Sequence, residues 1–178
     1  MNSKISVFVP AYNAEKTIET CINSILNQTI RPDTILIIND CSTDETKKIL
    51  NIFGTKIQVI HNKTNLGLSR SMNIAKDHLK TRYIAKIDAD VELTTNWIEI
   101  LLKKIEQKKA TLIGGKMYEK FTKNPFNLWR SLRLKQNWGE EDISDPKFIF
   151  GCNNRVKTNT RLVLNIPLCD RSIENMLY

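Results

Sequence analysis

The sequence predicts an α/β fold, in which a mostly parallel sheet lies between two layers of helices. Short apolar runs rich in β-branched residues alternate four times with stretches whose apolar residues recur at helical spacing. Such alternation is typical of a doubly wound parallel sheet, because each helix carries the chain back to the start of the next strand. The 178 residues, 41% of them hydrophobic, are enough for a single domain with a core of its own.

The apolar pattern places the elements in order. The expected strands lie at 4–9, 34–38, 57–60 and within 83–90, with further strands at 112–115 and 147–152. A first helix is expected to begin after Asn13, which would be its N-cap, and to carry apolar residues through 26. A second opens at 42–45, with a residue of 42–44 as N-cap, and ends at Gly54. A third follows 65–67 and carries apolar residues from 68 to 79, and a fourth spans 93–107.

The stretch 83–90 carries the central functional argument. A buried strand there runs into two carboxylates, Asp88 and Asp90, with one residue between them. Alternate side chains of an extended chain point the same way, so both should aim at one spot beyond the strand, at the edge where open α/β sheets bind ligands. Such oxygen ligands suit Mg²⁺ or Mn²⁺, which share their sites with substrate phosphates. Taken alone, the pair also fits a solvated Asp-Ala-Asp turn.

Composition narrows the class of protein and of partner. The net charge of +8 and the pI of about 9.4 favour anionic partners such as a nucleotide, a phospholipid surface or nucleic acid. The four cysteines are far apart and lack CxxC spacing, so we expect reduced thiols rather than a zinc site or a disulfide framework. Because neither a signal-peptide pattern nor a stretch of ~20 apolar residues occurs, we expect a cytoplasmic protein.

The ends of the first two strands carry further candidate binding groups. Pro10-Ala11-Tyr12-Asn13 stands where a dinucleotide-binding protein would have a glycine-rich turn, which argues against an NAD enzyme. Tyr12 is a candidate to stack on a base, or else is wedged at a strand-to-helix turn. Asp40 follows the second strand, where it can accept hydrogen bonds from a uracil N–H or a ribose hydroxyl. An unpaired charge is unfavourable at a buried strand tip, which favours this binding role.

Five short motifs follow one another along the first half of the chain. They are 10–13 (Pro-Ala-Tyr-Asn), 24–29 (Ser-Ile-Leu-Asn-Gln-Thr), 39–44 (Asn-Asp-Cys-Ser-Thr-Asp), 65–69 (Asn-Leu-Gly-Leu-Ser) and 88–90 (Asp-Ala-Asp). In this order and spacing the motifs resemble glycosyltransferase family 2, whose members have the GT-A fold and are inverting. The resemblance is good through about Gly115 and continues more weakly to 151–153.

The resemblance implies a role for each matched position. Pro10 and Tyr12 would line a uridine pocket, and Asp40 would read the base. Asp90 would be the direct metal ligand, with Asp88 near the ribose or at the metal through a water. Bound Mn²⁺ or Mg²⁺ would neutralise the charge on the departing nucleotide diphosphate. The other residues of the implied nucleotide-sugar site are Ala11, Asn13, Asn65, Gly67, Arg70 and Ala89. Arg70, the one cation of this set, would reach a phosphate or would instead lie on a solvated helix face.

The acceptor side is expected to be incomplete. We expect one domain over 1–178, with a nucleotide-sugar-binding half at 1–115 and a shortened acceptor-side half at 116–178. The family supplies a general base, an Asp of a Glu-Asp pair beyond a Gly-x-Asn strand, that takes the acceptor hydroxyl proton. The chain ends at Tyr178, where that pair would stand, so we expect the base to be absent. Asp142, in an acidic loop that precedes this strand, is a weak candidate, and Asp170 and Glu174 lie nearer the expected place but lack the motif context.

The resemblance implies an inverting, metal-dependent transfer of a sugar from a nucleotide-diphosphate sugar, expected to be a UDP-sugar, to a hydroxyl of a glycan or lipid-linked acceptor. A nucleotide-sugar-binding module without catalysis is one alternative. A basic nucleic-acid-binding domain is another, but the dispersed basic residues and the lack of a known motif argue for no nucleic-acid partner. The segment 125–138 mixes aromatic and basic residues, which fits peripheral membrane contact or a helix packed on the sheet edge. A homodimer that covers exposed apolar sheet surface is a further hypothesis.

Overall fold

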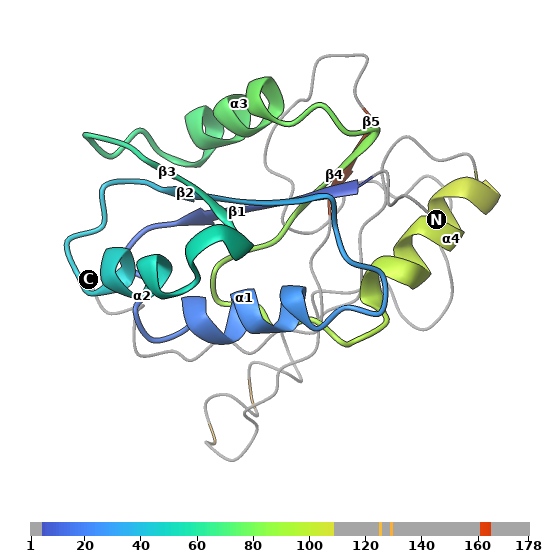
Figure 1. The fold of residues 1–178 in the computed structure, drawn as a ribbon, viewed down its shortest axis with the longest axis horizontal. Helices are drawn as coiled ribbons and strands as arrows, with labels where there is room; N and C mark the ends of the chain where they lie inside the picture. Colours follow the sequence, from blue (N-terminus) through green and yellow to red (C-terminus); the bar gives the residue numbers. More distant parts are fainter. Residues whose placement is uncertain (1–4, 109–124, 126–128, 130–160, 165–178) are drawn as a thin grey trace.

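The computed structural model describes residues 5–108, Pro125, Trp129 and residues 161–164. At its centre lies a sheet of five strands in the order β3-β2-β1-β4-β5, in which all neighbouring strands are parallel (Figure 1). The strands are β1 (Ile5–Ala11), β2 (Thr34–Asn39), β3 (Gln58–His61), β4 (Tyr83–Lys86) and β5 (Arg161–Leu164). The expected parallel sheet is therefore confirmed.

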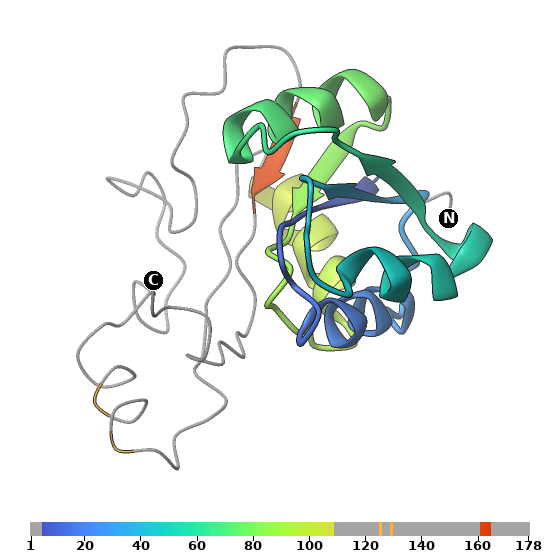
Figure 2. The ribbon, with the colours of Figure 1, turned by 90° about the vertical axis from the view of Figure 1, so that its left-hand side faces the viewer.

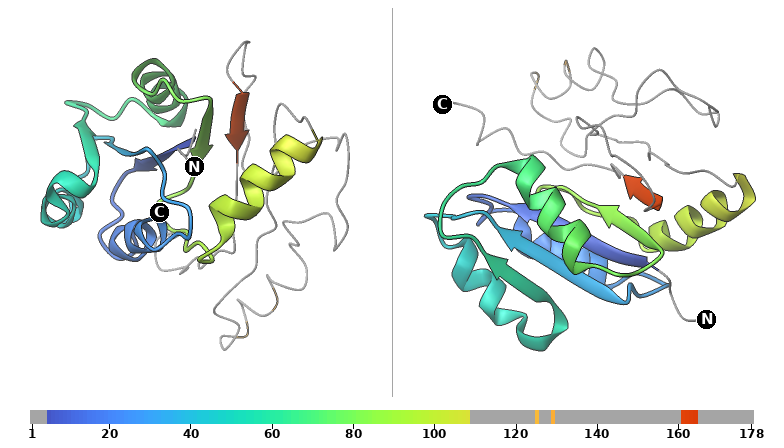
Figure 3. Two further views of the ribbon diagram at one scale, coloured as in Figure 1. Left: turned by 45° about the vertical axis from the view of Figure 1, so that its right-hand side comes forward. Right: turned by 90° about the horizontal axis from the view of Figure 1, so that it is seen from above.

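Helices cover both faces of this sheet. They are α1 (Ile18–Leu26), α2 (Thr46–Ile52), α3 (Leu68–His78) and α4 (Trp97–Lys108), with a short 3-10 turn η1 (Gly54–Lys56) after α2. Figures 2 and 3 show α3 over one face, while α1, α2 and α4 lie against the other. The described residues thus form the three-layer α/β/α arrangement that the alternation of strands and helices predicts.

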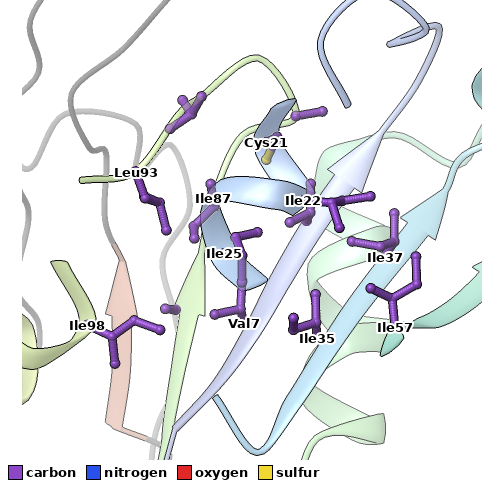
Figure 4. Close-up of a cluster of buried hydrophobic side chains, with 14 of the residues drawn as sticks. Val7, Cys21, Ile22, Ile25, Ile35, Ile37, Ile57, Ile87, Leu93 and Ile98 are labelled. Atoms are coloured by element: carbon purple, nitrogen blue, oxygen red, sulfur yellow. The ribbon is translucent and has the colours of Figure 1, made fainter. Parts of the chain in front are cut away.

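Alternation along β1 fills the core on both sides of the sheet. Val7 and Val9 belong to the buried cluster under α1, α2 and α4 (Figure 4), whereas Phe8 belongs to the cluster under α3. Helix α1 meets the first cluster with residues three or four positions apart, namely Ile18, Cys21, Ile22 and Ile25. Each fully buried aliphatic side chain of this kind contributes about 1.5–3 kcal/mol through removal of apolar surface from water.

Pro10 shows how β1 reaches beyond its neighbour β4. The last β1 residue paired with β4 is Phe8, opposite Lys86, whereas β1 stays paired with β2 as far as Ala11. The Phe8 carbonyl accepts the Ile87 N–H at 2.9 Å. The backbone groups of Pro10, two residues further on, face the same side, where no further β4 residue is paired. The missing proline N–H therefore costs the sheet no hydrogen bond.

Four expected element boundaries are wrong. The N-cap of α2 is Glu45 rather than a residue of 42–44. Asn13 is not the N-cap of α1, because Thr17 precedes that helix. Helix α4 begins at Trp97 rather than at 93, because the preceding residues are hydrogen-bonded to α1. Strand β4 ends at Lys86, and Val91 N–H donates to the Asp88 carbonyl at 3.2 Å in a turn. The argument that an extended chain aims both carboxylates at one spot is therefore wrong.

Other expectations lie outside the described residues. These are the strands at 112–115 and 147–152, the boundary between 115 and 116, and the segment 125–138 apart from Pro125 and Trp129. Strand β5 is a finding that the sequence pattern did not predict. It pairs in parallel with all four residues of β4 and so makes β4 an interior strand. Among the described helices, none combines the length and apolar character that a membrane span requires.

Candidate functional site

The carboxyl ends of β1, β2, β3 and β4 meet at one edge of the sheet, and the loops that follow them carry the predicted site residues. Hydrogen bonds continue the pairing just past the strands: Asp40 N–H donates to the Ala11 carbonyl at 2.8 Å, and Asn62 N–H donates to the Asn39 carbonyl at 2.9 Å. The pairing of Ile87 with Phe8 places the turn at 88–91 on the same edge. We call this place, formed by residues 11–13, 40–44, 62–67 and 87–91, the donor edge.

The first motif contributes mainly one side chain to the donor edge. Tyr12 is 52% exposed, whereas Ala11 is buried and Pro10 is half-buried within β1. Tyr12 directly follows the end of the central strand β1, so its exposed ring is available to a ligand at this edge. The alternative of a wedged, structural Tyr12 is not what the structure shows.

Asn13 joins the loops after β1 and β2. Its backbone has a φ of 47°, a left-handed conformation that asparagine tolerates better than most residues. Asn13 N–H donates to Ser42 Oγ at 3.0 Å, and Asn13 Oδ1 accepts the Thr43 N–H at 2.9 Å. The same loops are also joined where Glu15 N–H donates to Asp44 Oδ2 at 3.0 Å. These contacts fix the loop that presents Tyr12.

Asp40 is buried and accepts hydrogen bonds from three groups of its own chain. Its Oδ1 accepts from Asn62 Nδ2 at 2.7 Å and from Leu66 N–H at 2.8 Å, and its Oδ2 accepts from Gly67 N–H at 2.7 Å. Burial by itself raises the pKa of Asp40, but the hydrogen bonds from Leu66, Asn62 and Gly67 together hold it below the usual value. The carboxylate therefore stays charged and ties the loop before α3 to the tip of β2.

This arrangement changes the argument for Asp40 but not its predicted partner. The charge at the strand tip is already satisfied by the chain, so its burial no longer calls for a ligand. A carboxylate oxygen has two lone pairs, so Oδ2, which accepts Gly67 N–H, retains one acceptor direction that suits a uracil N–H. The role of Asp40 in reading a base stays a prediction.

The motif at 65–69 forms the turn that leads into α3. Asn65 Oδ1 accepts the Gly67 N–H at 3.1 Å, as in an Asx turn. Gly67 has φ 78° and ψ 168°, a backbone conformation that is essentially restricted to glycine. Arg70 is exposed on the first turn of α3, which is compatible with both the phosphate contact and the solvated helix face predicted for it.

Asp88 and Asp90 flank the turn after β4, and Ala89 between them is buried. Cys21 of α1 lies beneath this turn, with its Sγ 3.5 Å from the Asp88 carbonyl oxygen. Burial raises the pKa of the Cys21 thiol, and the charges of Asp90 and Asp88 raise it further. Both side chains are half-buried, so they remain within reach of a ligand.

The donor set fits a hard divalent cation that is shared with a phosphate ligand. Asp88 and Asp90 offer carboxylate oxygens, and within the described residues no group of three or more His, Cys, Asp or Glu gathers as a complete metal site. Mg²⁺ and Mn²⁺ commonly take one or two carboxylates and fill their remaining positions with water and substrate phosphates. The two aspartates are therefore the residues of this edge that could hold the predicted cation.

Two features of the site were not predicted from the sequence. The first is Lys86, a lysine that is only 3% exposed and whose Nζ lies 2.5 Å from Asp88 Oδ1. The second is a pair of hydrogen bonds that hold the segment after Asp90. Ser24 Oγ accepts the Leu93 N–H at 3.0 Å, and Gln28 Nε2 donates to the Thr94 carbonyl at 2.7 Å.

The motif that contains Ser24 and Gln28 carried the family resemblance but no predicted role. The structure shows that it connects α1 to the segment between the two aspartates and α4. The available signal was a glutamine two residues after the end of the amphipathic helix α1. Of the other predicted residues, Asp142 lies outside the described residues. Cys21 and Cys41 are free thiols, as expected, and the other two cysteines lie outside as well.

Comparisons with known proteins bear on this edge. The family model described as glycosyl transferase family 2 matches residues 6–162. An uncharacterized glycosyltransferase of Haemophilus influenzae is 41% identical over 118 residues, which are 65% of this chain and 36% of that protein. The UDP-Glc:alpha-D-GlcNAc-diphosphoundecaprenol beta-1,3-glucosyltransferase WfgD of Escherichia coli is 30% identical over 112 residues, 62% of this chain and 44% of that protein.

A solved structure shows the same likeness. S. aureus TarS 1-349 in complex with UDP-GlcNAc matches with a TM-score of 0.56 and 26% sequence identity, over 65% of this chain and 34% of that chain. The matched part thus spans 36%, 44% and 34% of these three proteins. Together with the all-parallel sheet, the structural likeness confirms the GT-A architecture that the motifs imply.

Proposed function

Because this chain belongs to glycosyltransferase family 2, as the match over residues 6–162 shows, we propose that it transfers a sugar from a UDP-linked donor to a hydroxyl of a glycan or lipid-linked acceptor. The UDP-linked donor is supported by the resemblance to TarS, whose solved structure holds UDP-GlcNAc. A lipid-linked acceptor is supported by the resemblance to WfgD, which is named for a diphosphoundecaprenol acceptor.

One structural observation carries the proposal. Three neighbouring parallel strands, β2, β1 and β4, are followed at one edge by an exposed aromatic ring, a buried hydrogen-bonded carboxylate and a pair of half-buried carboxylates; they are Tyr12, Asp40, Asp88 and Asp90. Open α/β sheets bind ligands at this edge. The set matches the parts of a UDP-sugar, since a ring can stack on uracil, a carboxylate can accept its N–H, and aspartates with a cation can hold the diphosphate.

The divalent cation is part of the proposal. Mn²⁺ or Mg²⁺ held by Asp90, with Asp88 beside it, would offset the negative charge that develops on the nucleotide diphosphate as the glycosidic bond breaks. The protein residues would then bind the uridine, orient the diphosphate and keep the anomeric carbon accessible to the acceptor. Inversion at that carbon follows from attack on the face opposite the departing diphosphate. We also propose a cytoplasmic location, at the membrane face if the acceptor is lipid-linked.

Calorimetric titration of UDP, with and without Mn²⁺, tests the donor site. We expect binding that tightens at least about tenfold with Mn²⁺, or 1.4 kcal/mol, and we expect Asp90→Ala to lose that gain. Asp77→Ala is the matched control, because Asp77 is an exposed aspartate near the far end of α3. Absence of UDP binding by a folded wild-type chain would refute the proposal.

A second measurement separates transfer from binding alone. The chain is incubated with UDP-GlcNAc and Mn²⁺, with and without a lipid-diphosphate-linked sugar, and release of UDP is followed over time. Acceptor-dependent release of UDP supports transfer. Tight, metal-dependent binding of UDP without any release identifies a nucleotide-sugar-binding module instead, since no general base is assigned among the described residues.

A further inference from the structure

Lys86 occupies an unusual position for a lysine. It is the last residue of β4, between Phe8 of β1 and Leu164 of β5 in the register of the sheet. Ile84, two residues earlier, belongs to the buried cluster under α3, so the alternation of the strand directs Lys86 to that same face. Its side chain is 4% exposed. An ammonium group in such a place is strongly unfavourable unless a charged partner lies against it.

The partner is Asp88, and the two ends of the pair differ in exposure. Lys86 Nζ donates to Asp88 Oδ1 at 2.5 Å, in a hydrogen bond between two opposite charges. The Asp88 side chain is 23% exposed and the Lys86 side chain is 4% exposed. The Lys86 ammonium group therefore lies inside the protein, and the Asp88 carboxylate lies between that group and the donor edge.

We propose that Lys86 is the internal counter-charge of the donor edge: it holds the Asp88 carboxylate and neutralises it, so that Asp90 is the carboxylate that binds the divalent cation. The inference rests on the proposed function and deepens it, because it adds Lys86 as the residue that fixes the separate roles which the resemblance implies for the two aspartates. Lys86 touches neither nucleotide nor cation, and it acts through Asp88 as a positioning residue.

The charge balance of the edge explains why such a residue is useful. Asp88 and Asp90 together carry two negative charges, and Lys86 reduces their sum to one. A nucleotide diphosphate is itself strongly anionic, so an edge with two uncompensated carboxylates repels it until a cation is bound. With Lys86 present, repulsion of the nucleotide is weaker, and attraction of a free divalent cation is weaker as well. The pair thus favours binding of the cation together with the nucleotide over binding of the cation alone.

Titration with Mn²⁺ alone tests this inference without relying on activity. Free Mn²⁺ is followed by electron paramagnetic resonance for the wild type, for Lys86→Met, and for the double variant Lys86→Met/Asp88→Asn. We expect Lys86→Met to bind Mn²⁺ about tenfold more tightly, the effect of one unit charge several ångström away at a protein edge. The double variant restores the net charge of the wild-type edge, so its Mn²⁺ affinity should return to within about twofold of the wild-type value.

A second readout uses UDP without metal. Lys86→Met should weaken metal-free UDP binding about tenfold, because removal of the Lys86 charge makes the edge one unit more negative and so more repulsive to the diphosphate. The difference in UDP affinity between Lys86→Met and the wild type should shrink when Mn²⁺ is saturating. Lys86→Arg keeps the charge and should resemble the wild type in both titrations. Replacement of a lysine with a purely structural role would not strengthen Mn²⁺ binding while it weakens metal-free UDP binding.

The outcomes are decisive in either direction. An Mn²⁺ affinity of folded Lys86→Met no higher than that of the wild type overturns the inference. Loss of Mn²⁺ binding in the double variant also overturns it, because Asp88 would then be a metal ligand. If Lys86→Met does not fold, as judged by a circular-dichroism melt, the double variant and Lys86→Arg decide, since neither leaves a buried charge unpaired. A wild-type chain that binds no UDP counts instead against the proposed function.

Discussion

The Gln28 side chain, two residues after the end of α1, accepts the backbone N–H of Ile98, in the first turn of α4, at 2.9 Å. The first N–H groups of a helix have no partner within the helix, and here a residue that follows another helix supplies one. The Gln28 amide also donates to the carbonyls of Ser24 and Thr94 at 3.0 and 2.7 Å. One buried glutamine thereby fixes the segment that runs from the metal-site turn into α4.

Replacement of this glutamine should therefore destabilise the protein. Gln28→Met preserves the approximate volume but leaves the Ile98 N–H and the Thr94 carbonyl unpaired in a buried place, which should lower the free energy of unfolding by about 2–3 kcal/mol. In a domain of this size the melting temperature should fall by about 4–10 °C. Urea unfolding measures the effect. The control Asn23→Ala, on the exposed side of α1, should change stability by less than about 0.5 kcal/mol.

Asp40 should make the stability of the protein depend on pH. Its folded-state pKa lies below the usual value, so the unfolded chain takes up a proton first as the pH falls, and stability falls with it. The contribution is complete above the ordinary aspartate pKa, near about 4, and is lost as the pH falls through the lower folded-state value. Asp40→Asn should lower the free energy of unfolding by about 2 kcal/mol at pH 7, because an amide N–H₂ would face backbone N–H donors.

The pH series distinguishes this account from a general loss of packing. Urea unfolding at pH 7, 5, 4 and 3.5 should show the difference between wild type and Asp40→Asn shrinking only below about pH 4. The exposed control Asp77→Asn should follow the wild type throughout. A destabilisation by Asp40→Asn that is the same at every pH would show that the ionised carboxylate is not its source.

Asp40 and Lys86 also show where sequence reasoning succeeds and where it stops. Apolar alternation and helical spacing predict β1 to β4 and the inner face of α1, because these patterns record burial that each segment carries in its own residues. The partners of Asp40 lie at Asn62, Leu66 and Gly67, more than twenty residues away, and no local pattern records them. A lysine within a strand is normally read as solvated, so the burial of Lys86 follows only from the presence of β5 and Asp88.

Two of the boundaries that were wrong, those at the starts of α1 and α4, have a common cause. Helix α4 begins later than its apolar pattern indicates because Ser24 and Gln28 take the backbone groups of Leu93 and Thr94. Asn13 is a favoured capping residue by type, but the loop after β2 offers it better partners than α1 does. Strand β5 was missed because its four residues are set by pairing with β4, which depends on residues far apart in the sequence. Long-range hydrogen bonds therefore decide what local propensity leaves open.

Gly67 should be required for both stability and the shape of the donor edge. Its φ of 78° and ψ of 168° are strained for any other residue, and a Cβ at this position would meet no atom within 4 Å. Gly67→Ala should therefore cost about 1–3 kcal/mol of stability through the backbone alone. Because the Gly67 N–H binds Asp40 Oδ2, calorimetry should also show weaker UDP binding.

The matched control for this prediction is Gly54→Ala. Gly54 also has a positive φ, of 52°, and open space around it, but it lies after α2, away from the donor edge. This variant should lose stability and keep the wild-type affinity for UDP. Equal loss of UDP affinity in both variants would mean that global destabilisation, and not the position of Asp40, controls nucleotide binding.

Tyr12 should matter for nucleotide binding and not for folding. The side chain is 52% exposed at the end of β1, so Tyr12→Ala should change the free energy of unfolding by less than about 0.5 kcal/mol. Stacking of an aromatic ring on a base contributes about 1–3 kcal/mol, so calorimetry should show UDP binding weakened about tenfold or more. Tyr12→Phe keeps the ring and should bind UDP as the wild type does. An affinity that is unchanged in Tyr12→Ala excludes stacking, and an equal loss in Tyr12→Phe assigns the contact to the hydroxyl instead.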